Sequence, residues 1–219
     1  MARYRIESGC RFSVDSGFKE DIVVIDTLRA SSTIVTALAA GVKEIYPVCS
    51  DAEALRLKEN GIPVAGEKGG VRLKGYDFGN SPVELLEAFN KKPFEQLGLT
   101  TTNMIPLLTK LRSAYICSSL NLAYMSDYIS GRNACLIAVG GINGNAEDLG
   151  VALALVASIA GADYNEDMIA CFIRESNAAQ HLRSIGYVDD VDFISRANVY
   201  DVIAWYDGSV IHDAGRSCG

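Results

Sequence analysis

The sequence predicts an α/β fold, with a mostly parallel sheet, helices on both faces of that sheet and a helix-rich C-terminal third. Two observations predict this fold. Short apolar runs alternate with segments of helical apolar spacing through most of the chain, as they do in βα units. Polar motifs follow the predicted strands one after another, and the carboxyl ends of parallel strands are where such sheets bind ligands.

The predicted strands are short apolar runs bounded by polar or glycine-containing segments, at residues 22–25, 43–48, 62–65, 97–100, 115–117 and 135–139. Helical spacing between and after them predicts helices at residues 32–40, 51–60, from 82 onward, 105–111, 121–129 and 146–159. Ser50 with Glu53, and Ser81 with Glu84, have the spacing of capping boxes. Pro82 stands at a first helical position, where its missing N–H is tolerated.

The last third changes to helical patterns at residues 165–176, 177–185 and 189–197. A hairpin pattern follows at 202–206 and 209–211 around the pair Asp207-Gly208. No linker or repeat separates this part from the rest. We therefore expect an α/β core at residues 1–160 that carries the polar motifs, and a helical and hairpin extension at 161–219 packed on the same domain.

Composition limits the partners of the chain. The net charge of −7 over 219 residues, with a pI near 4.9, argues against nucleic acid as a main partner. The N-terminus has no signal-like apolar run, and the longest apolar run, residues 151–160, is too short to span a bilayer. The six cysteines are scattered without a CxxC pair, which is typical of reduced proteins. We expect a cytoplasmic protein that binds a small anion and neither nucleic acid nor membranes.

Residues 21–33 hold the most informative motif. A strand leads into Asp26, Arg29 follows, and hydroxyl side chains precede a helix. A helix N-terminus presents free N–H groups and positive partial charge, and an arginine beside it can bind an anion through two hydrogen bonds. The motif indicates a phosphate or sulfonate site, with Mg²⁺ held between Asp26 and the anion. As alternatives, Asp26 is a nucleophile or a turn carboxylate, and Ser31 or Ser32 serves only as the N-cap.

Later loops repeat this combination of polar groups. After the strand at 62–65, a glycine-rich loop joins Glu67 and Lys68 to Gly69, and glycines let backbone N–H groups approach an anion closely. A flexible surface loop is the alternative interpretation. The chain then reaches Asn80 and Ser81 at a capped helix start, a second candidate anion site.

Hydrogen-bonding side chains also follow the next two predicted strands: Thr101, Thr102 and Asn103, and then Ser118. Glu147 and Asp148 come after a glycine-rich loop, in the first turn of a long helix. Acids there favour the helix dipole, or they form a second pair of metal-directed carboxylates. His181 and His212 lie away from these motifs in the sequence, and we give neither a role.

Other phosphoryl-transfer classes lack support in the sequence. It has no GxxxxGK[ST] loop, no cysteine with an arginine six positions later, and no DxD pair at Asp26. These absences argue against a P-loop NTPase, a cysteine phosphatase and a haloacid-dehalogenase-like phosphatase.

Taken in order, the motifs IDTLRASST, GEKGG, DFGNSP, TTTN and SSLN resemble the 2-phosphosulfolactate phosphatase family, from about residue 21 to about residue 150. The resemblance implies a Mg²⁺-dependent acid phosphatase with an α/β fold. It also implies a small anionic substrate, 2-phospho-3-sulfolactate, which loses phosphate to leave 3-sulfolactate in coenzyme M biosynthesis.

Combined with the motifs, the resemblance assigns roles to individual residues. Asp26 and Glu67 would bind Mg²⁺, and Arg29 would act with them in catalysis. The absent DxD partner favours attack by water over a phosphoenzyme formed on Asp26. The expected substrate-binding residues are Ser31, Ser32, Lys68, Gly69, Asn80, Ser81, Thr101, Thr102, Asn103 and Ser118.

Two departures from the family pattern bear on the substrate. Met104 and Ile105 stand where small residues are usual, which predicts a more apolar pocket if that loop lines it. Lys68 stands where arginine is common, so charge is kept but the planar fork is lost. The alternatives are therefore a phosphatase of another small phosphorylated acid, or a non-catalytic anion-binding module. The frequency of twofold oligomers suggests a homodimer.

Overall fold

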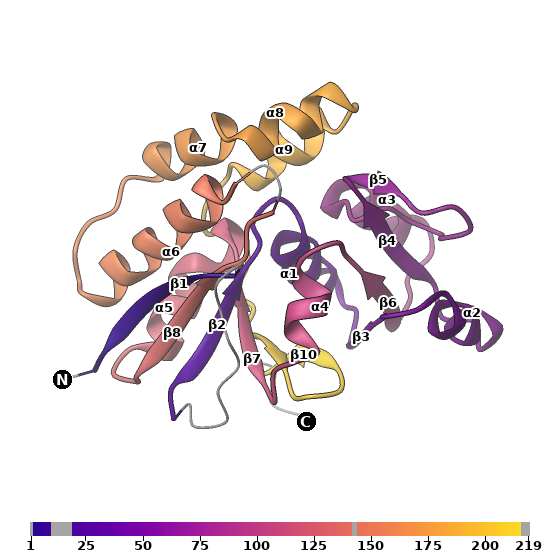
Figure 1. Ribbon diagram of the computed structural model, residues 1–219, viewed down its shortest axis with the longest axis horizontal. Helices are drawn as coiled ribbons and strands as arrows, with labels where there is room; N and C mark the ends of the chain where they lie inside the picture. Colours follow the sequence, from indigo (N-terminus) through magenta and orange to yellow (C-terminus); the bar gives the residue numbers. More distant parts are fainter. Residues whose placement is uncertain (1, 10–18, 142–143, 216–219) are drawn as a thin grey trace.

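The computed structural model describes residues 2–9, 19–141 and 144–215. One ten-stranded sheet runs through these residues in the order β1-β8-β2-β7-β9-β10-β3-β6-β4-β5, with helices packed on both of its faces (Figure 1). This confirms the predicted α/β class and the mostly parallel sheet. No helix within the described ranges is both long enough and apolar enough to cross a membrane.

The sheet contains two groups of parallel strands. The first group comprises β1 (Tyr4–Ser8), β8 (Ala134–Ala138), β2 (Asp21–Ile25) and β7 (Ala114–Cys117). The second comprises β3 (Glu44–Pro47), β6 (Gln96–Thr100) and β4 (Val64–Lys68), and the short β5 (Val71–Arg72) pairs antiparallel with β4.

A C-terminal hairpin joins the two groups. β9 (Ala204–Tyr206) pairs antiparallel with β7, and β10 (Ile211–Asp213) pairs antiparallel with both β9 and β3. Three successive antiparallel pairings lead from β7 through β9 and β10 to β3. The strands of the second group therefore run antiparallel to those of the first group. The division of the chain at residue 160 stays a prediction, but the predicted hairpin lies inside the sheet rather than on its surface.

The helices agree with most of the predicted segments. Their bounds are α1 Ala30–Ala40, α2 Asp51–Glu59, α3 Pro82–Lys91, α4 Met104–Leu108, α5 Leu122–Ile129, α6 Ala146–Ile159, α7 Glu166–Arg174, α8 Asn177–Ser184 and α9 Val188–Ile194, with a 3₁₀ turn at Ser119–Asn121. Both predicted N-caps are present, because Ser50 accepts a hydrogen bond from the Glu53 amide and Ser81 accepts one from the Glu84 amide. The sequence did not predict β1 or β5.

Alternation along β2 shows how the sheet separates two apolar layers. Val24 faces a cluster that includes Leu38 of α1, whereas Val23 and Ile25 face a second cluster with Leu155 of α6. All of these side chains are fully buried, and each such burial contributes roughly 1.5–3 kcal/mol. The packed layers hold the end of β2 in place, and helices α7 to α9 lie beyond that end (Figure 1).

Candidate active site

A pocket of about 380 Å³ is lined by segments from both parallel groups of strands. Its wall includes several residues predicted from the sequence: Asp26, Arg29, Glu67, Gly69, Asn80, Thr102 and Asn103. It also includes the two acids at the start of α6, glycines after β8, and one face of α8. The polar motifs at the ends of β2 and β4 therefore lie around one pocket, although the two strands belong to groups of opposite direction.

Asp26 is fixed by a compact loop after β2. Its backbone N–H donates to Ser31 Oγ at 2.8 Å, and the Ser31 N–H donates back to the Asp26 carbonyl at 2.8 Å. Ser32 Oγ donates to the Thr27 carbonyl at 2.8 Å. Both serine side chains are fully buried and neither lines the pocket, so their hydroxyls hold the loop. Neither serine is the N-cap, because α1 begins at Ala30 and follows Arg29.

The Asp26 carboxyl group is itself buried, with 9% of the residue exposed. Burial raises its pKa to about 7, and the nearby carboxyl groups of Glu67 and Glu147 add to this rise. A carboxylate in such surroundings is costly to ionise without a cation.

Asp148 and Glu147 open α6 beside Asp26. Asp148 accepts hydrogen bonds from the Thr27 N–H at 2.6 Å and the Gly140 N–H at 2.8 Å, so it joins the loops after β2 and β8. Burial raises the pKa of Asp148, and the charges of Asp26 and Glu147 add to that rise. Burial also raises the pKa of Glu147. The sequence left two interpretations of these acids, and the structure places both on the pocket wall.

Glu67 approaches from the second group of strands. Its side chain accepts from the Thr102 N–H at 2.7 Å, the Thr102 hydroxyl at 3.0 Å and the Gly70 N–H at 2.7 Å. Three donors on one carboxylate fix its orientation. These bonds also hold the loops after β4 and β6 together, so Thr102 orients Glu67 as well as lining the pocket.

Together these four carboxyl groups provide oxygen ligands of the kind that Mg²⁺ prefers. Within the ranges that the structure describes, no three His, Cys, Asp or Glu side chains are placed to hold one metal ion together. Mg²⁺ commonly uses only one or two carboxylates and completes its shell with waters and substrate phosphate. The residues therefore fit Mg²⁺ by their chemistry, as an open site rather than a preformed cage.

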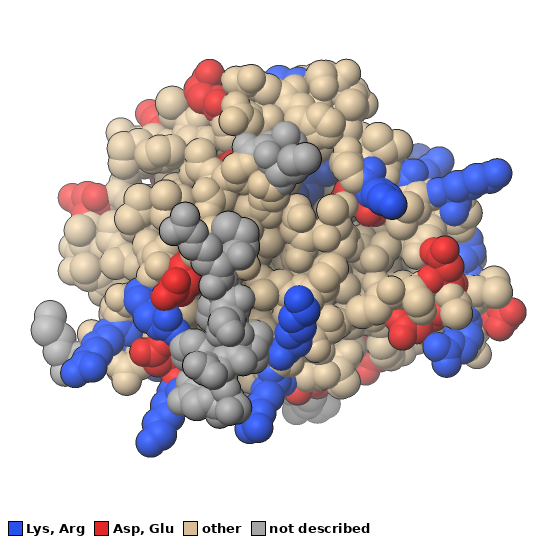
Figure 2. Space-filling model, viewed as in Figure 1, with Lys and Arg blue, Asp and Glu red and all other residues tan. Residues whose placement is uncertain are grey.

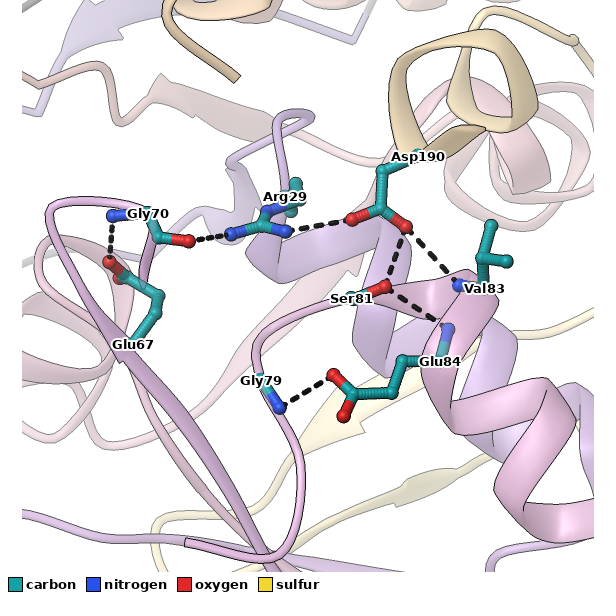
Figure 3. A network of polar contacts seen from close by, with 8 residues as sticks. All are labelled: Arg29, Glu67, Gly70, Gly79, Ser81, Val83, Glu84 and Asp190. Atoms are coloured by element: carbon teal, nitrogen blue, oxygen red, sulfur yellow. Dashed lines mark hydrogen bonds and ion pairs between the residues drawn. The ribbon is translucent and has the colours of Figure 1, made fainter. Parts of the chain in front are cut away.

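Arg29 occupies the centre of a buried polar network (Figure 3). Its guanidinium donates to Asp190 Oδ2 at 2.7 Å and to the Gly70 carbonyl at 2.5 Å, and it stacks 4.0 Å from the centre of the Tyr187 ring. Asp190 also accepts from the Ser81 hydroxyl at 2.7 Å. Arg29 and Asp190 are 2% and 1% exposed at their side chains. Arg29 thus joins the β2 loop to the glycine loop and to α9, and Ser81 belongs to this network rather than to the pocket wall.

Sequence reasoning missed Asp190 for a physical reason. It lies 161 residues from Arg29 along the chain, in the first turn of α9, where an acid is explained by the helix dipole alone. No local spacing connects the two residues.

The remaining predicted residues lie at different depths. Asn80 lines the pocket, and its side-chain oxygen is buried without a hydrogen-bond partner in the described structure. Thr101 accepts from the Ile105 N–H, and Ser118 caps the 3₁₀ turn, so both hold local backbone. Lys68 follows Glu67 in β4 and is exposed outside the pocket, because successive strand residues point to opposite faces.

On the face shown in Figure 2, basic and acidic side chains are interspersed, and basic ones also gather at the right, where Figure 1 places β4 and β5. Lys68 and Arg72 are exposed residues of these two strands.

Met104 and Ile105 do not line the pocket, so the condition for a more apolar pocket is not met. Both side chains are buried in the apolar cluster around α1, and the pocket wall includes neither of them. They begin α4, whose inward face carries them into the core rather than toward the loop surface. Met104 instead lies under the β2 loop, with its sulfur 3.9 Å from Ser31 Oγ.

Comparison with known proteins shows the family of this chain. The model of the family described as 2-phosphosulpholactate phosphatase matches residues 13–209. The probable 2-phosphosulfolactate phosphatase of Thermotoga maritima is 32% identical over 198 residues, covering 83% of this chain and 86% of that protein. The 2-phosphosulfolactate phosphatase of Methanocaldococcus jannaschii is 30% identical over 202 residues, covering 84% and 88%.

The match extends beyond the motifs into the C-terminal helices, including α8, which lines the pocket. A similar likeness, 30% over 206 residues, holds for the 2-phosphosulfolactate phosphatase of Methanothermobacter thermautotrophicus, with 86% of this chain and 88% of that protein covered. The chain therefore belongs to the 2-phosphosulfolactate phosphatase family, a family of phosphoric monoester hydrolases.

Proposed function

We propose that this protein is a Mg²⁺-dependent phosphatase that hydrolyses 2-phospho-3-sulfolactate to 3-sulfolactate and phosphate, a step of coenzyme M biosynthesis. The observation that carries the proposal is the gathering of Asp26, Glu67, Glu147 and Asp148 around one pocket. Buried acids that repel each other are stabilised by a cation, and phosphoryl transfer needs a cation to neutralise phosphate oxygens. The names of the relatives supply the substrate.

Asp26 and Glu67 are the residues that we expect to hold Mg²⁺. Asp26 is fixed by its own loop and Glu67 by Thr102 of the loop after β6. The two acids come from opposite groups of strands, so an ion between them would bridge the halves of the pocket. When bound, Mg²⁺ supplies positive charge to the phosphate oxygens and orients them. Glu147 and Asp148 add negative charge behind Asp26, which strengthens its hold on a cation.

Other pocket residues are suited to the anionic substrate. Asn80 and Asn103 place amide groups, which carry N–H donors, on the pocket wall, and Thr102 lies beside Asn103 after β6. Arg29 contributes positive charge, although two of its donors are already bonded to Asp190 and Gly70. Since Met104 and Ile105 lie in the core, they give no reason to expect a different substrate class.

The test is phosphate release from 2-phospho-3-sulfolactate by the purified protein, with Mg²⁺ and with excess chelator. We expect turnover that disappears with the chelator and returns when Mg²⁺ is restored. An Asp26→Asn variant that folds normally should remain inactive under both conditions. Turnover that is indifferent to chelation would contradict the proposed metal, and binding of the ester without turnover would identify an anion-binding module instead.

A further inference from the structure

We propose that His181 is a catalytic residue, the general acid that protonates the leaving oxygen of the phosphate ester. This inference rests on the proposed phosphatase function and assigns a role that the active-site motifs of the sequence do not contain. The position of α8, one hydrogen bond and the charge of the pocket support this role.

α8 presents one face to the pocket. Ala178, His181 and Leu182 line it, with the three- and four-residue spacing of neighbours on a helix surface. His181 thus shares the pocket wall with Asp26 and Glu67, although it lies more than a hundred residues away from both in the chain.

A single hydrogen bond defines which nitrogen of His181 can exchange a proton. Its Nε2 lies 3.0 Å from the carbonyl oxygen of Gly69. A carbonyl only accepts hydrogen bonds, so Nε2 must carry a hydrogen in this contact. Nδ1 is then the nitrogen that gains and loses a proton, while the bond to Gly69 holds the ring in one orientation.

The charges of the pocket single out His181 for this role. Among the described residues of the wall, the other basic side chain is Arg29, which is bonded to Asp190 and to the Gly70 carbonyl and does not release a proton. Glu67 and Asp148 accept N–H donors from the backbone, so their oxygens are already engaged in holding loops. The carboxyl groups on the wall also give the pocket an acidic lining.

The step balances without a further reactant. A water oxygen forms a bond to phosphorus as the ester P–O bond breaks, and the electron pair of that bond goes to the ester oxygen. The ester oxygen takes the proton from His181 Nδ1 and leaves as a hydroxyl group. The attacking water releases a proton to solvent, and neutral His181 then regains one from solvent.

Leaving-group dependence separates this role from a structural one. An alkoxide is a poor leaving group and needs the proton, whereas p-nitrophenolate leaves readily without it. His181→Gln removes the acid but keeps an amide N–H that can donate to the Gly69 carbonyl. We expect its kcat for 2-phospho-3-sulfolactate to fall about 10²–10³-fold, and its kcat for p-nitrophenyl phosphate to fall less than about fivefold.

Two variants provide controls. His212→Gln changes the other histidine of the chain, which lies on β10 and does not line the pocket, and it should leave both substrates unaffected. Glu147→Gln removes another protonatable group of the pocket wall, and its loss should be similar for both substrates.

Several results would overturn the inference. Equal losses on both substrates in His181→Gln would make His181 a support for the glycine loop, and unchanged activity would remove it from the reaction. A loss confined to the alkyl ester in Glu147→Gln but absent in His181→Gln would transfer the role to Glu147. If the wild-type protein hydrolyses neither ester, the proposed function itself fails, whereas the preceding results overturn only the role of His181.

Discussion

The loops after β2 and β4 lie around the same pocket but are held in different ways. The β2 loop is closed by its own buried serines and by Asp148, and Ser31, Ser32 and Thr27 are fully buried. The β4 loop, by which we mean the end of β4 and the two glycines after it (residues 67–70), is partly exposed. Hydrogen bonds from other segments hold it in place. These bonds come from Thr102, Arg29 and His181.

The difference shows where the geometry of the site is decided. Asp26 is positioned by its own loop and by Asp148, so changes in the β4 loop should leave it in place. Glu67 and the glycines depend on distant residues of β6, α1 and α8, so the second wall of the pocket is sensitive to changes that never touch the substrate. The Arg29 bond to the Gly70 carbonyl is the direct link between the two loops (Figure 3).

Removing the charge of Asp190, the buried partner of Arg29, should have the largest effect on stability. Asp190→Asn leaves the Arg29 charge buried without a carboxylate, so we expect a loss of about 3–5 kcal/mol in the free energy of unfolding, measured with urea. The matched control is Glu95→Gln, which breaks the exposed Lys43–Glu95 pair and should cost less than about 1 kcal/mol. Equal costs would mean that the buried pair does not hold the loops together.

Replacing Arg29 itself should weaken activity. In Arg29→Lys, a point charge replaces a planar fork and cannot bond Asp190 and the Gly70 carbonyl in the same geometry. We expect kcat/KM to fall by an amount equivalent to about 1–3 kcal/mol of transition-state binding. An unchanged kcat/KM would show that neither the substrate nor the glycine loop depends on this guanidinium.

The two glycines of the β4 loop offer a matched comparison of smaller effects. Both have positive φ, +60° at Gly69 and +86° at Gly70, so an alanine is strained at either position. A Cβ at Gly70 would also lie 2.8 Å from Ile185 of the segment after α8, whereas one at Gly69 meets nothing within 4 Å. Gly70→Ala should therefore lower both stability and kcat/KM more than Gly69→Ala, by about 0.5–1.5 kcal/mol in stability, because the Ile185 side chain must move. Equal effects would place α8 away from the loop in solution.

The β2 loop should instead affect how the stability of the metal-free protein depends on pH. Because the folded pKa of Asp26 is raised from 3.8 to about 7, the folded state holds a proton that the unfolded state releases. Stability should fall as pH rises through this window. Asp26→Asn should raise the Tm relative to wild type more at pH 8 than at pH 4, measured by thermal unfolding in chelator. A Tm difference that does not change with pH would contradict the buried, unpaired state of Asp26.

Much of the fold followed from local patterns, and the pairing of distant segments did not. Apolar runs and capping residues predicted most strands and helices, because these signals act within a few residues. β1 was missed because its residues are only half-buried at the edge of the sheet. The two strand groups run in opposite directions because the C-terminal hairpin inserts between β7 and β3. A local pattern predicted the hairpin, but no local pattern encodes its place in the sheet.

For the site, too, local patterns indicated residues at strand ends but not their partners from distant segments. Strand ends pointed to Asp26, Glu67 and Thr102, which all line the pocket. Asp190 and His181 belong to helices whose local sequence explains them without any ligand, so only the tertiary structure connects them with the site. Hydroxyls near a strand end were expected at the substrate, but several of them hold backbone instead, because buried loops must satisfy their own N–H and carbonyl groups.

Mg²⁺ affinity, measured by titration calorimetry, tests most directly whether both groups of strands serve one ion. We predict that Asp26→Asn and Glu67→Gln each weaken Mg²⁺ binding at least about tenfold. The double variant should bind Mg²⁺ only slightly less tightly than the single variant with the lower affinity, because the two carboxylates would share one ion. Ser81→Ala, which alters the Asp190 network without touching a carboxylate of the pocket, should bind Mg²⁺ nearly as the wild type does. Wild-type affinity in Glu67→Gln would contradict the account, since the second group of strands would then contribute no ligand.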